Sequence, residues 1–522
     1  MMVHQQDDME PHVDTNAPRE IELKLTIDPQ AETGLDLAGL DLPGGRLRFR
    51  RQMLETTYYD TEDGRLRRRR MALRVRKSGD CHVQTLKTAG TGGALSVRGE
   101  WETPLDGPVP DVSMIGDADV VARLGLILPE QLDAMFVTLF DRQKALWSDG
   151  GNEVEIAFDR GRIEAGDRQV PIAEIELELK GGEARAIFEL VERIRHVVPV
   201  RIGTEPKADR GYRLRHDQPP AWTRSGVSSL EPSISLEQGI RTILRDCLTH
   251  WIDNEPAALD GRDSEGVHQL RVGIRRMRSA LVLFRPWLDP SGVAALEPRL
   301  KEALKALGPA REIDVFIEDL LEPCWNDILA HIDPAALLEV TARARREAYA
   351  DLHAWLGGRD YADLVLDLVA WVELDRWKGE HVGGRLRTVA EVLLEKRHRK
   401  LLRRGRGFDR LPDEKRHELR LDLKKLRYAV DFLSPLFSGR KVRKGRKSFA
   451  RLQEGLGNAN DLAECRLRIE EILAREDLGN DRFEVAKAAG FLHGWTARAL
   501  TTTRAETDAA WNDFVEVKPF WR

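Results

Sequence analysis

Hydrophobic and polar residues alternate one by one in several segments between residues 19 and 216, most clearly at 20–25, 73–76, 97–102 and 174–180. A period of two residues is typical of β-strands with one apolar and one charged face. Glycine-containing turns at 90–93 and 150–151 separate such segments, as they would in hairpins. A single short helix is predicted at about 183–196. The first part is therefore predicted to be mostly antiparallel β-sheet.

The pattern changes after Pro219 and Pro220. From Leu236 to about Trp511, apolar residues recur at the helical period and alternating segments are hard to find. The proline- and serine-containing stretch between the two patterns is typical of a linker. We therefore predict an α+β multidomain protein. Its expected parts are a polar N-terminal tail at 1–18, a β domain at 19–216, a linker at 217–235 and a helical domain at 236–515.

The helical part contains an internal repeat. A basic motif that begins at His268 recurs at His417, 149 positions later, and the same spacing carries Leu307 onto Leu456. Constant spacing over some forty residues indicates duplication of one helical unit, with halves at about 236–380 and 381–515. The matched basic residues are His268, Arg271, Arg275, Arg276 and Arg278 in the first copy, and His417, Arg420, Lys424, Lys425 and Arg427 in the second.

Most of each basic set falls on one side of its predicted helix, opposite apolar residues such as Leu270 and Leu419. An ordinary solvated surface explains either copy taken alone. Duplication of cations in particular favours a long linear polyanion as the partner, because many phosphate contacts together give strong binding. We expect the apolar faces to be buried against each other and the two basic stripes to point outward as one extended track.

The composition bounds the class of protein. The chain has 522 residues, 42% of them hydrophobic, which excludes general disorder. The four cysteines lie far apart with no CxxC pair, so a disulfide framework or Cys-rich zinc site is not expected and a reducing compartment is favoured. No apolar run approaches the roughly 18 residues of a membrane-spanning helix, and the N-terminus is polar and acidic. We predict a cytoplasmic protein without a membrane partner.

The net charge of −5 conceals strong local imbalance, because residues 396–447 hold 20 Lys and Arg against 6 Asp and Glu. Nucleic acid is not the expected partner, because the basic stripes carry few aromatic platforms, Tyr428 being the exception. No zinc-finger spacing or RNA-recognition signature is present either. Inorganic polyphosphate requires only positive charge and fits the composition better.

The charged faces of the predicted strands carry both signs. Carboxylates suit a hard divalent cation, and the cations suit phosphate. A solvated sheet face with cross-strand ion pairs is the simpler alternative for any one strand. Recurrence on at least four strands favours a closed sheet with its charged faces inward, an interior that is costly unless metal and anion fill it. The acids are Glu20, Glu22, Glu100, Glu102, Glu174, Glu176 and Glu178; the cations are Lys24, Arg74, Arg76, Lys87, Arg98 and Arg142.

Other catalytic motifs fail on spacing. The nearest stretch to a GxxxxGK[ST] phosphate loop begins at Gly439 but has Lys444 in place of the second glycine. The sequence has no HExxH metalloprotease motif and no GxSxG elbow.

The motifs of both parts resemble known families. Residues 20–24 form the ExExK signature of the CYTH family, the triphosphate tunnel metalloenzymes, and LRVRK, QTLK, VRGEWE, LFDR, EIAFD, EIELELK and PKADRGY follow in the family's order up to about residue 216. The helical part resembles a CHAD domain, whose hallmark is the duplicated H-x-x-R-x-x-x-[RK]-[RK]-x-R helix. Its LGxxRDxD element matches residues 307–314 and adds Arg311 to the expected polyphosphate-binding residues.

The resemblance implies an eight-stranded antiparallel tunnel, open at both ends, that hydrolyses inorganic triphosphate with Mg²⁺ or Mn²⁺. It adds Asp159 to the metal-binding acids, assigns the phosphoryl oxygens to Arg74, Arg76, Lys87, Arg98 and Arg142, and leaves Lys24 or Lys207 to orient water or the leaving group. CHAD domains are associated with polyphosphate, which makes polyphosphate granules an open option for localisation. The alternatives are an inactive polyphosphate-binding scaffold, or an enzyme acting on a nucleoside or thiamine triphosphate, including an adenylate cyclase.

Overall fold

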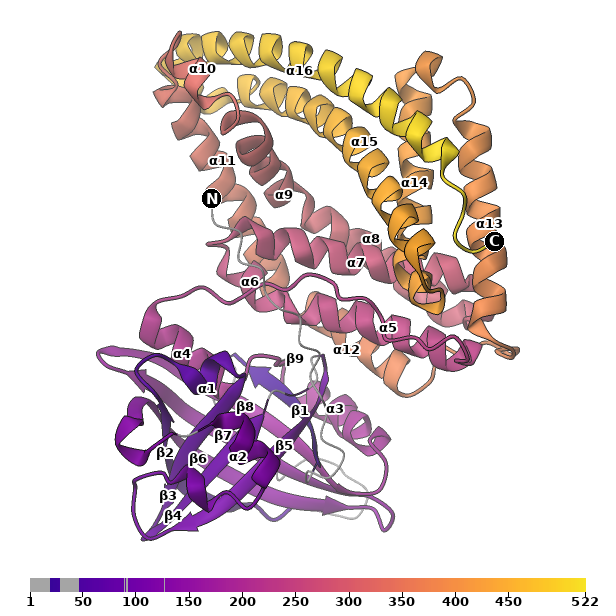
Figure 1. Ribbon diagram of the computed structural model, residues 1–522. Helices are drawn as coiled ribbons and strands as arrows, with labels where there is room; N and C mark the ends of the chain where they lie inside the picture. The colour runs from indigo at the N-terminus through magenta and orange to yellow at the C-terminus, as the bar shows by residue number, and fades with distance from the viewer. Residues whose placement is uncertain (1–18, 29–46, 89, 91–92, 126) are drawn as a thin grey trace. The chain divides into compact units, whose positions relative to one another are not determined.

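The computed structural model describes residues 19–28, 47–88, 90, 93–125 and 127–522. It divides into two compact units, Met1–Gln218 and Pro219–Arg522 (Figure 1). The predicted polar tail at 1–18 lies outside the described residues. The α+β architecture predicted from the two periodicities is confirmed, with an antiparallel sheet in the first unit and helices in the second.

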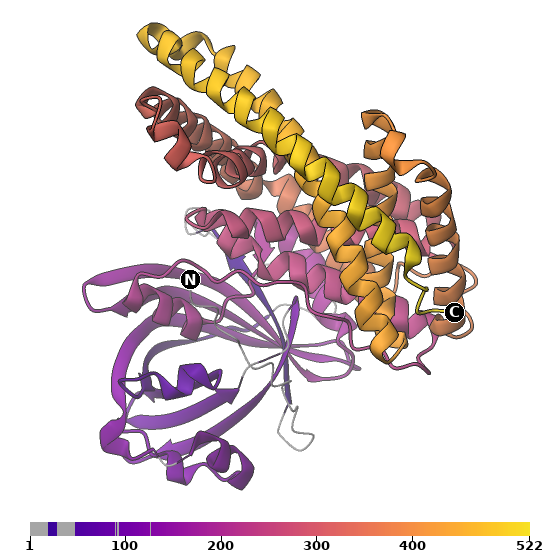
Figure 2. The ribbon, with the colours of Figure 1, turned by 45° about the horizontal axis from the view of Figure 1, so that its top comes forward.

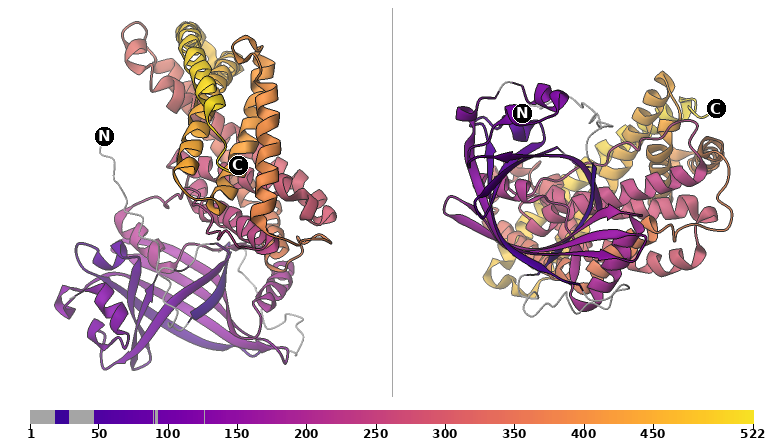
Figure 3. Two further views of the ribbon diagram at one scale, coloured as in Figure 1. Left: turned by 45° about the vertical axis from the view of Figure 1, so that its right-hand side comes forward. Right: turned by 90° about the horizontal axis from the view of Figure 1, so that it is seen from below.

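One antiparallel sheet dominates the first unit. Its strand order is β5-β4-β3-β2-β6-β7-β8-β1-β9, and β5 pairs with β1 as well, so that eight strands close on themselves and β9 adds to β1. Figure 3 (right) shows the closed ring end on. The strands are β1 Arg19–Ile27, β2 Arg50–Asp60, β3 Met71–Ser78, β4 Cys81–Thr88, β5 Leu95–Leu105, β6 Asp133–Ser148, β7 Glu153–Ala165, β8 Arg168–Gly181 and β9 Val200–Ile202.

Four helices accompany this sheet: α1 (Arg65–Arg68), α2 (Ala118–Leu124), α3 (Arg185–Val197) and α4 (Lys207–His216). The predicted helix at 183–196 is α3, which packs on β8. Helix α4 packs on β6, β7 and β8.

Helix α4 covers the inner face of the ring at one end. The ring of Tyr212 on α4 packs edge-on against the ring of Phe136, with 5.2 Å between the ring centres. The Phe136 ring in turn stacks on the Tyr58 ring, with 4.5 Å between their centres. Phe136 and Tyr58 lie on the same sheet face as the charged residues of β6 and β2. These rings belong to a buried apolar cluster with Phe140, Ile163 and others. The expectation of a tunnel open at both ends therefore differs from the structure, because apolar packing fills the interior beside α4.

The second unit is mainly helical over its described residues. Its long C-terminal helices α15 and α16 pack along each other (Figures 1 and 2). A π-helical segment, Phe316–Leu321, continues α9. The helices are α5 Leu236–Asp253, α6 Glu255–Asp260, α7 Ser264–Phe284, α8 Pro290–Ala306, α9 Gly308–Val315, α10 Trp325–Leu329, α11 Ala335–Gly357, α12 Arg359–Glu373, α13 Leu386–Arg404, α14 Asp413–Leu433, α15 Arg440–Leu473 and α16 Arg482–Glu516.

The predicted duplication is confirmed in the helix boundaries. A shift of 149 residues carries α7 onto α14 from end to end, and it brings α5 onto α13 within two residues at each end. The same shift carries α8 and α9 together onto the single helix α15, and α11 into α16. The apolar residues expected on the buried faces of α7 and α14, including Ile274 and Leu423, are fully buried. Within the described residues, no helix is both long enough and apolar enough to cross a membrane.

Gly211 allows α4 to approach the sheet. A Cβ atom at this position would lie 2.1 Å from Cε2 of Phe136. We predict that Gly211→Ala destabilises the protein by about 1–3 kcal/mol, because the added methyl overpacks a filled interior. Gly107→Ala is the control, since no atom lies within 4 Å of a Cβ there. Thermal denaturation measures both; equal stability of the two variants would show that α4 is not held this closely.

Candidate functional site

Strand register places the predicted tunnel residues on one face of the closed sheet. Residues that pair directly across antiparallel strands point to the same side, and the pairs Lys24–Glu176, Glu174–Asp159 and Asp159–Arg142 link three neighbouring pairs of strands. The remaining strands continue the same parity around the ring. The residues on this face whose side chains are described are Glu22, Lys24, Arg74, Arg76, Lys87, Glu100, Glu102, Arg142, Asp159, Glu174, Glu176 and Glu178.

Lys207 binds three of these carboxylates at once. Its Nζ lies 2.9 Å from Asp159 Oδ2, 2.8 Å from Glu174 Oε2 and 2.8 Å from Glu176 Oε1. Arg142 donates two hydrogen bonds of 2.6 Å to Asp159 and one of 2.5 Å to Glu176. The ammonium of α4 and the guanidinium of β6 thus share one group of acids on β7 and β8.

Mutual attraction keeps Lys207 and Glu176 charged. Burial by itself would lower the pKa of Lys207, but Asp159, Glu174 and Glu176 raise the pKa above its ordinary value. Burial would raise the pKa of Glu176, yet Lys207 and Arg142 hold this pKa well below its usual range. Burial of these charges is costly, and the close pairing of the acids with Lys207 and Arg142 offsets this cost.

Lys24 sits at the edge of the same group with longer contacts. Its Nζ is 3.6 Å from Glu176 Oε1 and 3.9 Å from Glu174 Oε2. These distances are too long for strong charge-assisted hydrogen bonds, which are about 2.7–2.9 Å. Lys24 is therefore less tightly committed to the acids than Lys207.

A second group on the same face is rich in cations. Lys87 Nζ lies 2.8 Å from Glu100 Oε2, and Arg74 Nη2 lies 3.4 Å from Glu100 Oε1. Arg76 is half-buried and has no ion pair among the described residues. The charge of Arg74, burial and the charge of Arg142 lower the pKa of Arg76 to about 10. Three guanidinium groups thus repel one another here, an arrangement that an anion would stabilise.

The other predicted acids are placed differently. Glu102 is exposed and accepts a 3.5 Å hydrogen bond from Thr85. Glu178 accepts from Lys180 at 2.5 Å. Glu22 is buried and lies directly across from Glu178. The side chains of Glu20 and Arg98 lie outside the described residues, although their backbone register is known.

The acids on this face fit a divalent cation in their chemistry. Among the described residues, no three acidic, histidine or cysteine side chains already converge as a ligand set. Glu22 and Glu178 lie directly across from each other on β1 and β8, so that the strand register brings two acids together on this face. Carboxylate oxygens are the ligands that hard divalent ions prefer.

One contributor to the site was not predicted. Arg210 of α4 donates to Glu174 and, at 2.6 Å, to the carbonyl oxygen of Pro171. Arg210 follows Lys207 by three residues, one helical turn, so both side chains reach β8. That spacing is the sequence signal that would have revealed it.

In the helical unit, the helices that carry the two basic stripes, α7 and α14, pack on each other. Arg271, Arg275, Arg420 and Lys424 are all half-buried. Burial, Arg420 and Arg275 lower the pKa of Lys424 to about 8, which shows that charges from the two repeats are close together. The expected outward track is therefore not present; the stripes converge between the repeats. Arg271, Arg275, Arg420 and Lys424 are called the central cluster below.

Acids satisfy only part of this central cluster. Arg420 Nη1 donates to Asn460 Oδ1 at 2.9 Å, and Arg420 Nη2 lies 3.4 Å from Asp461 Oδ1. Arg275 and Lys424 have no ion pair among the described residues. Asn460 and Asp461 lie on α15 in the element that repeats LGxxRDxD, and they were not among the predicted site residues.

The other predicted residues of the helical unit lie in varied surroundings. Arg276 is only 4% exposed, and its guanidinium carbon lies 5.1 Å from the centre of the Phe432 ring, so it belongs to the core and not to an accessible stripe. Arg311 pairs with Glu318 at 3.0 Å. His268 is half-buried, and burial followed by Arg311 lowers its pKa. The remaining positions are His417 and Lys425, both exposed, and Arg278 and Arg427, both half-buried.

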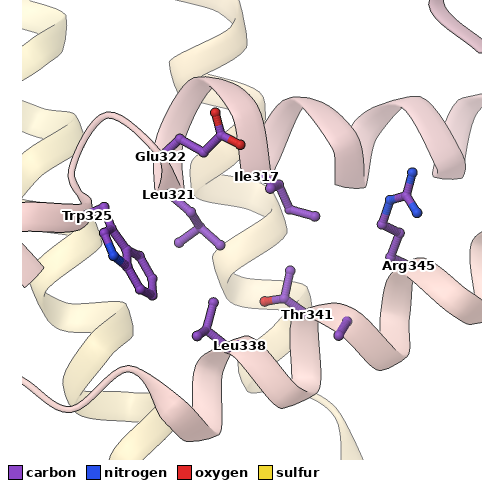
Figure 4. Close-up of a pocket in the computed structure, with 8 residues that line it drawn as sticks. Ile317, Leu321, Glu322, Trp325, Leu338, Thr341 and Arg345 are labelled. Carbon is purple, nitrogen blue, oxygen red and sulfur yellow. The ribbon is translucent and has the colours of Figure 1, made fainter. Parts of the chain in front are cut away.

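A separate cavity of about 470 Å³ contains none of the predicted site residues (Figure 4). Apolar side chains such as Leu321, Trp325 and Leu338 form most of its wall, with Glu322 and Arg345 at its margin. Arg345 is already bound to Asp314 at 2.8 Å. The cavity has neither the charge nor the free polar groups of the two charged sites.

Comparison with known proteins identifies one domain in each part of the chain. Residues 18–212 match the CYTH domain and residues 242–470 match the CHAD domain. The inorganic triphosphatase of Haemophilus influenzae is 34% identical over 212 residues, which are 38% of this chain and 56% of that protein. The match thus spans little more than half the length of this curated relative.

Solved structures resemble the chain in part. The CHAD domain from the plant Ricinus communis is 29% identical and covers 55% of this chain and 97% of its own, with a TM-score of 0.47. HpAC1 from Hippeastrum, which has a dominant triphosphatase activity, is 21% identical and covers 38% of this chain and 96% of its own, with a TM-score of 0.28. By the two domain matches, the chain is a fusion of an N-terminal CYTH domain with a C-terminal CHAD domain.

Proposed function

We propose that the CYTH domain is a metal-dependent inorganic triphosphatase that converts triphosphate to pyrophosphate and phosphate. The observation that carries this proposal is the gathering of Arg74, Arg76 and Arg142 on the inner sheet face beside a group of buried carboxylates. A cationic wall suits the phosphoryl oxygens, while the acids suit a divalent ion. The 34% identical relative is named an inorganic triphosphatase, which supports the same substrate.

In this proposal, the acidic residues bind the metal ion and the basic residues bind the phosphate groups. Glu22, Glu176 and Glu178 would hold Mg²⁺ or Mn²⁺, which when bound neutralises charge on the phosphate chain and favours in-line attack by water. Arg76, which has no ion pair within the described part of the chain, would bind a phosphoryl oxygen directly. Lys87 and Arg74 would complete the anion site next to Glu100.

The two lysines have different roles in this proposal. Lys207 is a positioning residue, because its three short contacts fix Asp159, Glu174 and Glu176 relative to one another. Lys24, with contacts of 3.6 and 3.9 Å, is freer to turn toward the attacking water or the leaving phosphate. Charge-assisted donation to the leaving oxygen would stabilise it as the bond breaks.

We further propose that the central cluster of the CHAD domain binds inorganic polyphosphate. Arg275 and Lys424 are half-buried cations without an ion pair in the described part of the chain, and they come from opposite repeats. Burial, Arg420 and Arg275 lower the pKa of Lys424, and an anion bound beside these cations would relieve their repulsion. A phosphate polymer supplies such anions in a row.

Removal of one metal-site charge should abolish hydrolysis. We expect Glu22→Gln and Glu176→Gln each to lower kcat for triphosphate by at least about 100-fold, because charge stabilisation at the reacting phosphorus is lost. The exposed Glu130→Gln is the control. Phosphate release with Mn²⁺ measures activity, and circular dichroism shows that each variant is folded. Near-normal turnover in a folded Glu22→Gln or Glu176→Gln protein would show that the substituted carboxylate does not hold the metal. Absence of turnover in the wild-type protein would leave only a polyphosphate-binding scaffold.

Arg76 should chiefly determine triphosphate affinity. Arg76→Ala removes a charge-assisted contact worth about 1.5–3 kcal/mol, so kcat/KM should fall about ten- to a hundredfold. Lys77→Ala is matched to it, because Lys77 is the next residue of β3 and points to the opposite sheet face. Steady-state kinetics of both variants decide the point. If the two variants lose equal efficiency, Arg76 does not contact substrate.

Polyphosphate binding should weaken as pH rises. In the protein without ligand, the pKa of Lys424 is lowered to about 8. A bound polyanion favours the charged form of this lysine. Above pH 8, Lys424 must therefore take up a proton when polyphosphate binds. The dissociation constant should therefore rise about tenfold between pH 7 and pH 9. Lys424→Arg should flatten this dependence, because arginine stays protonated throughout. Titrations with chelator present measure both; the same slope in wild type and Lys424→Arg would remove Lys424 from the site.

A further inference from the structure

Helix α15 begins with a dense group of exposed cations. All six lie within its first eight residues, and no acid occurs among them. The helix buries its other side, where Val442 and Gly445 pack inward and a Cβ on Gly445 would lie 2.9 Å from the Phe520 ring. The six residues are Arg440, Lys441, Arg443, Lys444, Arg446 and Lys447, called the α15 patch below.

This arrangement is electrostatically unfavourable in the protein by itself. The N-terminus of a helix carries partial positive charge, which disfavours cations in the first turns. Residues three and four positions apart are neighbours on a helix, so Arg440 faces both Arg443 and Lys444 with like charge. The first turn holds no acid and no capping side chain. None of the six has an ion pair among the described residues, so nothing in the described chain offsets this repulsion.

The α15 patch is distinct from the central cluster but rigidly connected to it. Asp461, which contacts Arg420 of the central cluster, lies on α15, 17 residues after Lys444. At a rise of 1.5 Å per residue, this separation is about 26 Å along one continuous helix. An anion that contacts both places must be a long polymer.

We propose that the α15 patch is a second attachment site for inorganic polyphosphate, so that one long chain bridges it and the central cluster. The inference rests on the proposed binding of polyphosphate by the central cluster. Polyphosphate fits better than single-stranded nucleic acid, because base stacking needs exposed aromatic rings. The aromatic residue nearest along this helix, Phe449, is buried.

Bridging makes affinity depend on polymer length. Once a chain is held at the central cluster, its contact with the α15 patch becomes intramolecular and adds to affinity without a second encounter. A chain shorter than the separation of the two places gains nothing from the patch. The α15 patch should therefore increase affinity for long polyphosphate but not for short polyphosphate.

The test reverses four charges of the α15 patch in the full-length protein: Arg440→Glu, Lys441→Glu, Lys444→Glu and Lys447→Glu. Glutamate at a helix N-terminus is favourable, so this variant should fold at least as stably as wild type, as thermal denaturation will show. The matched control reverses four exposed cations elsewhere in the same unit: Arg346→Glu, Arg359→Glu, Lys487→Glu and Arg498→Glu.

Titrations use polyphosphate of about five and of about one hundred phosphates, with chelator to prevent hydrolysis. The patch variant should lose about ten- to a hundredfold in affinity for the long chain and less than about threefold for the short one. Its salt dependence for the long chain should also become shallower, because fewer phosphates are neutralised. The control should change less than about threefold with either length.

Three outcomes would overturn the inference: unchanged long-chain binding in the patch variant, an equal loss in the control, or equally tight patch-dependent binding of single-stranded DNA of the same charge.

A variant with a charge-reversed central cluster, Arg275→Glu with Lys424→Glu, separates this result from the proposed function. If that variant alone abolishes binding of both lengths, the central site stands and the patch does not. If wild type binds neither length, both proposals fail.

Discussion

The ammonium group of Lys207 is the contact on which the CYTH domain's interior depends. It lies within 2.9 Å of carboxylates from β7 and β8, while its own helix, α4, packs against the inner sheet face through Tyr212 and Phe136. Without this cation, Asp159, Glu174 and Glu176 would have only the cations around them, such as Arg142, to balance their charge. Removal of one partner from a buried ion group is far more costly than its formation is favourable. The position of α4 and the arrangement of the three acids therefore depend on each other.

The two domains differ in how far internal acids balance their buried cations. In the CYTH domain, Arg142 and Lys207 are balanced by internal acids, whereas Arg76 has no ion pair with any residue that the structure describes. In the CHAD domain, Arg275 and Lys424 face each other across the repeat with little compensation. The first arrangement suits a small substrate that must be oriented among acids and cations. The second suits a polymer that supplies the missing negative charge itself.

Duplication gives the CHAD domain its symmetry but not identical environments. Helices α7 and α14 correspond residue for residue, and their apolar faces are buried as their periodicity predicts. Yet Arg276 is enclosed beside Phe432, whereas its counterpart Lys425 is exposed. The motif is the same in both copies, and the neighbouring helices decide which cation is available to a ligand.

Much of this protein follows from local pattern alone. Alternation of period two determines which residues of a strand share a face, so Glu22, Lys24, Glu174 and Glu176 had to lie together once the strands paired. The constant 149-residue spacing likewise determined the helical repeat. Only the tertiary structure decided that Lys207 and Arg210 reach back to Glu174, that α4 fills one end of the ring, and that the basic stripes converge instead of pointing outward. Such contacts join residues far apart in the sequence, and their geometry depends on how whole elements pack, which periodicity along a single element cannot encode.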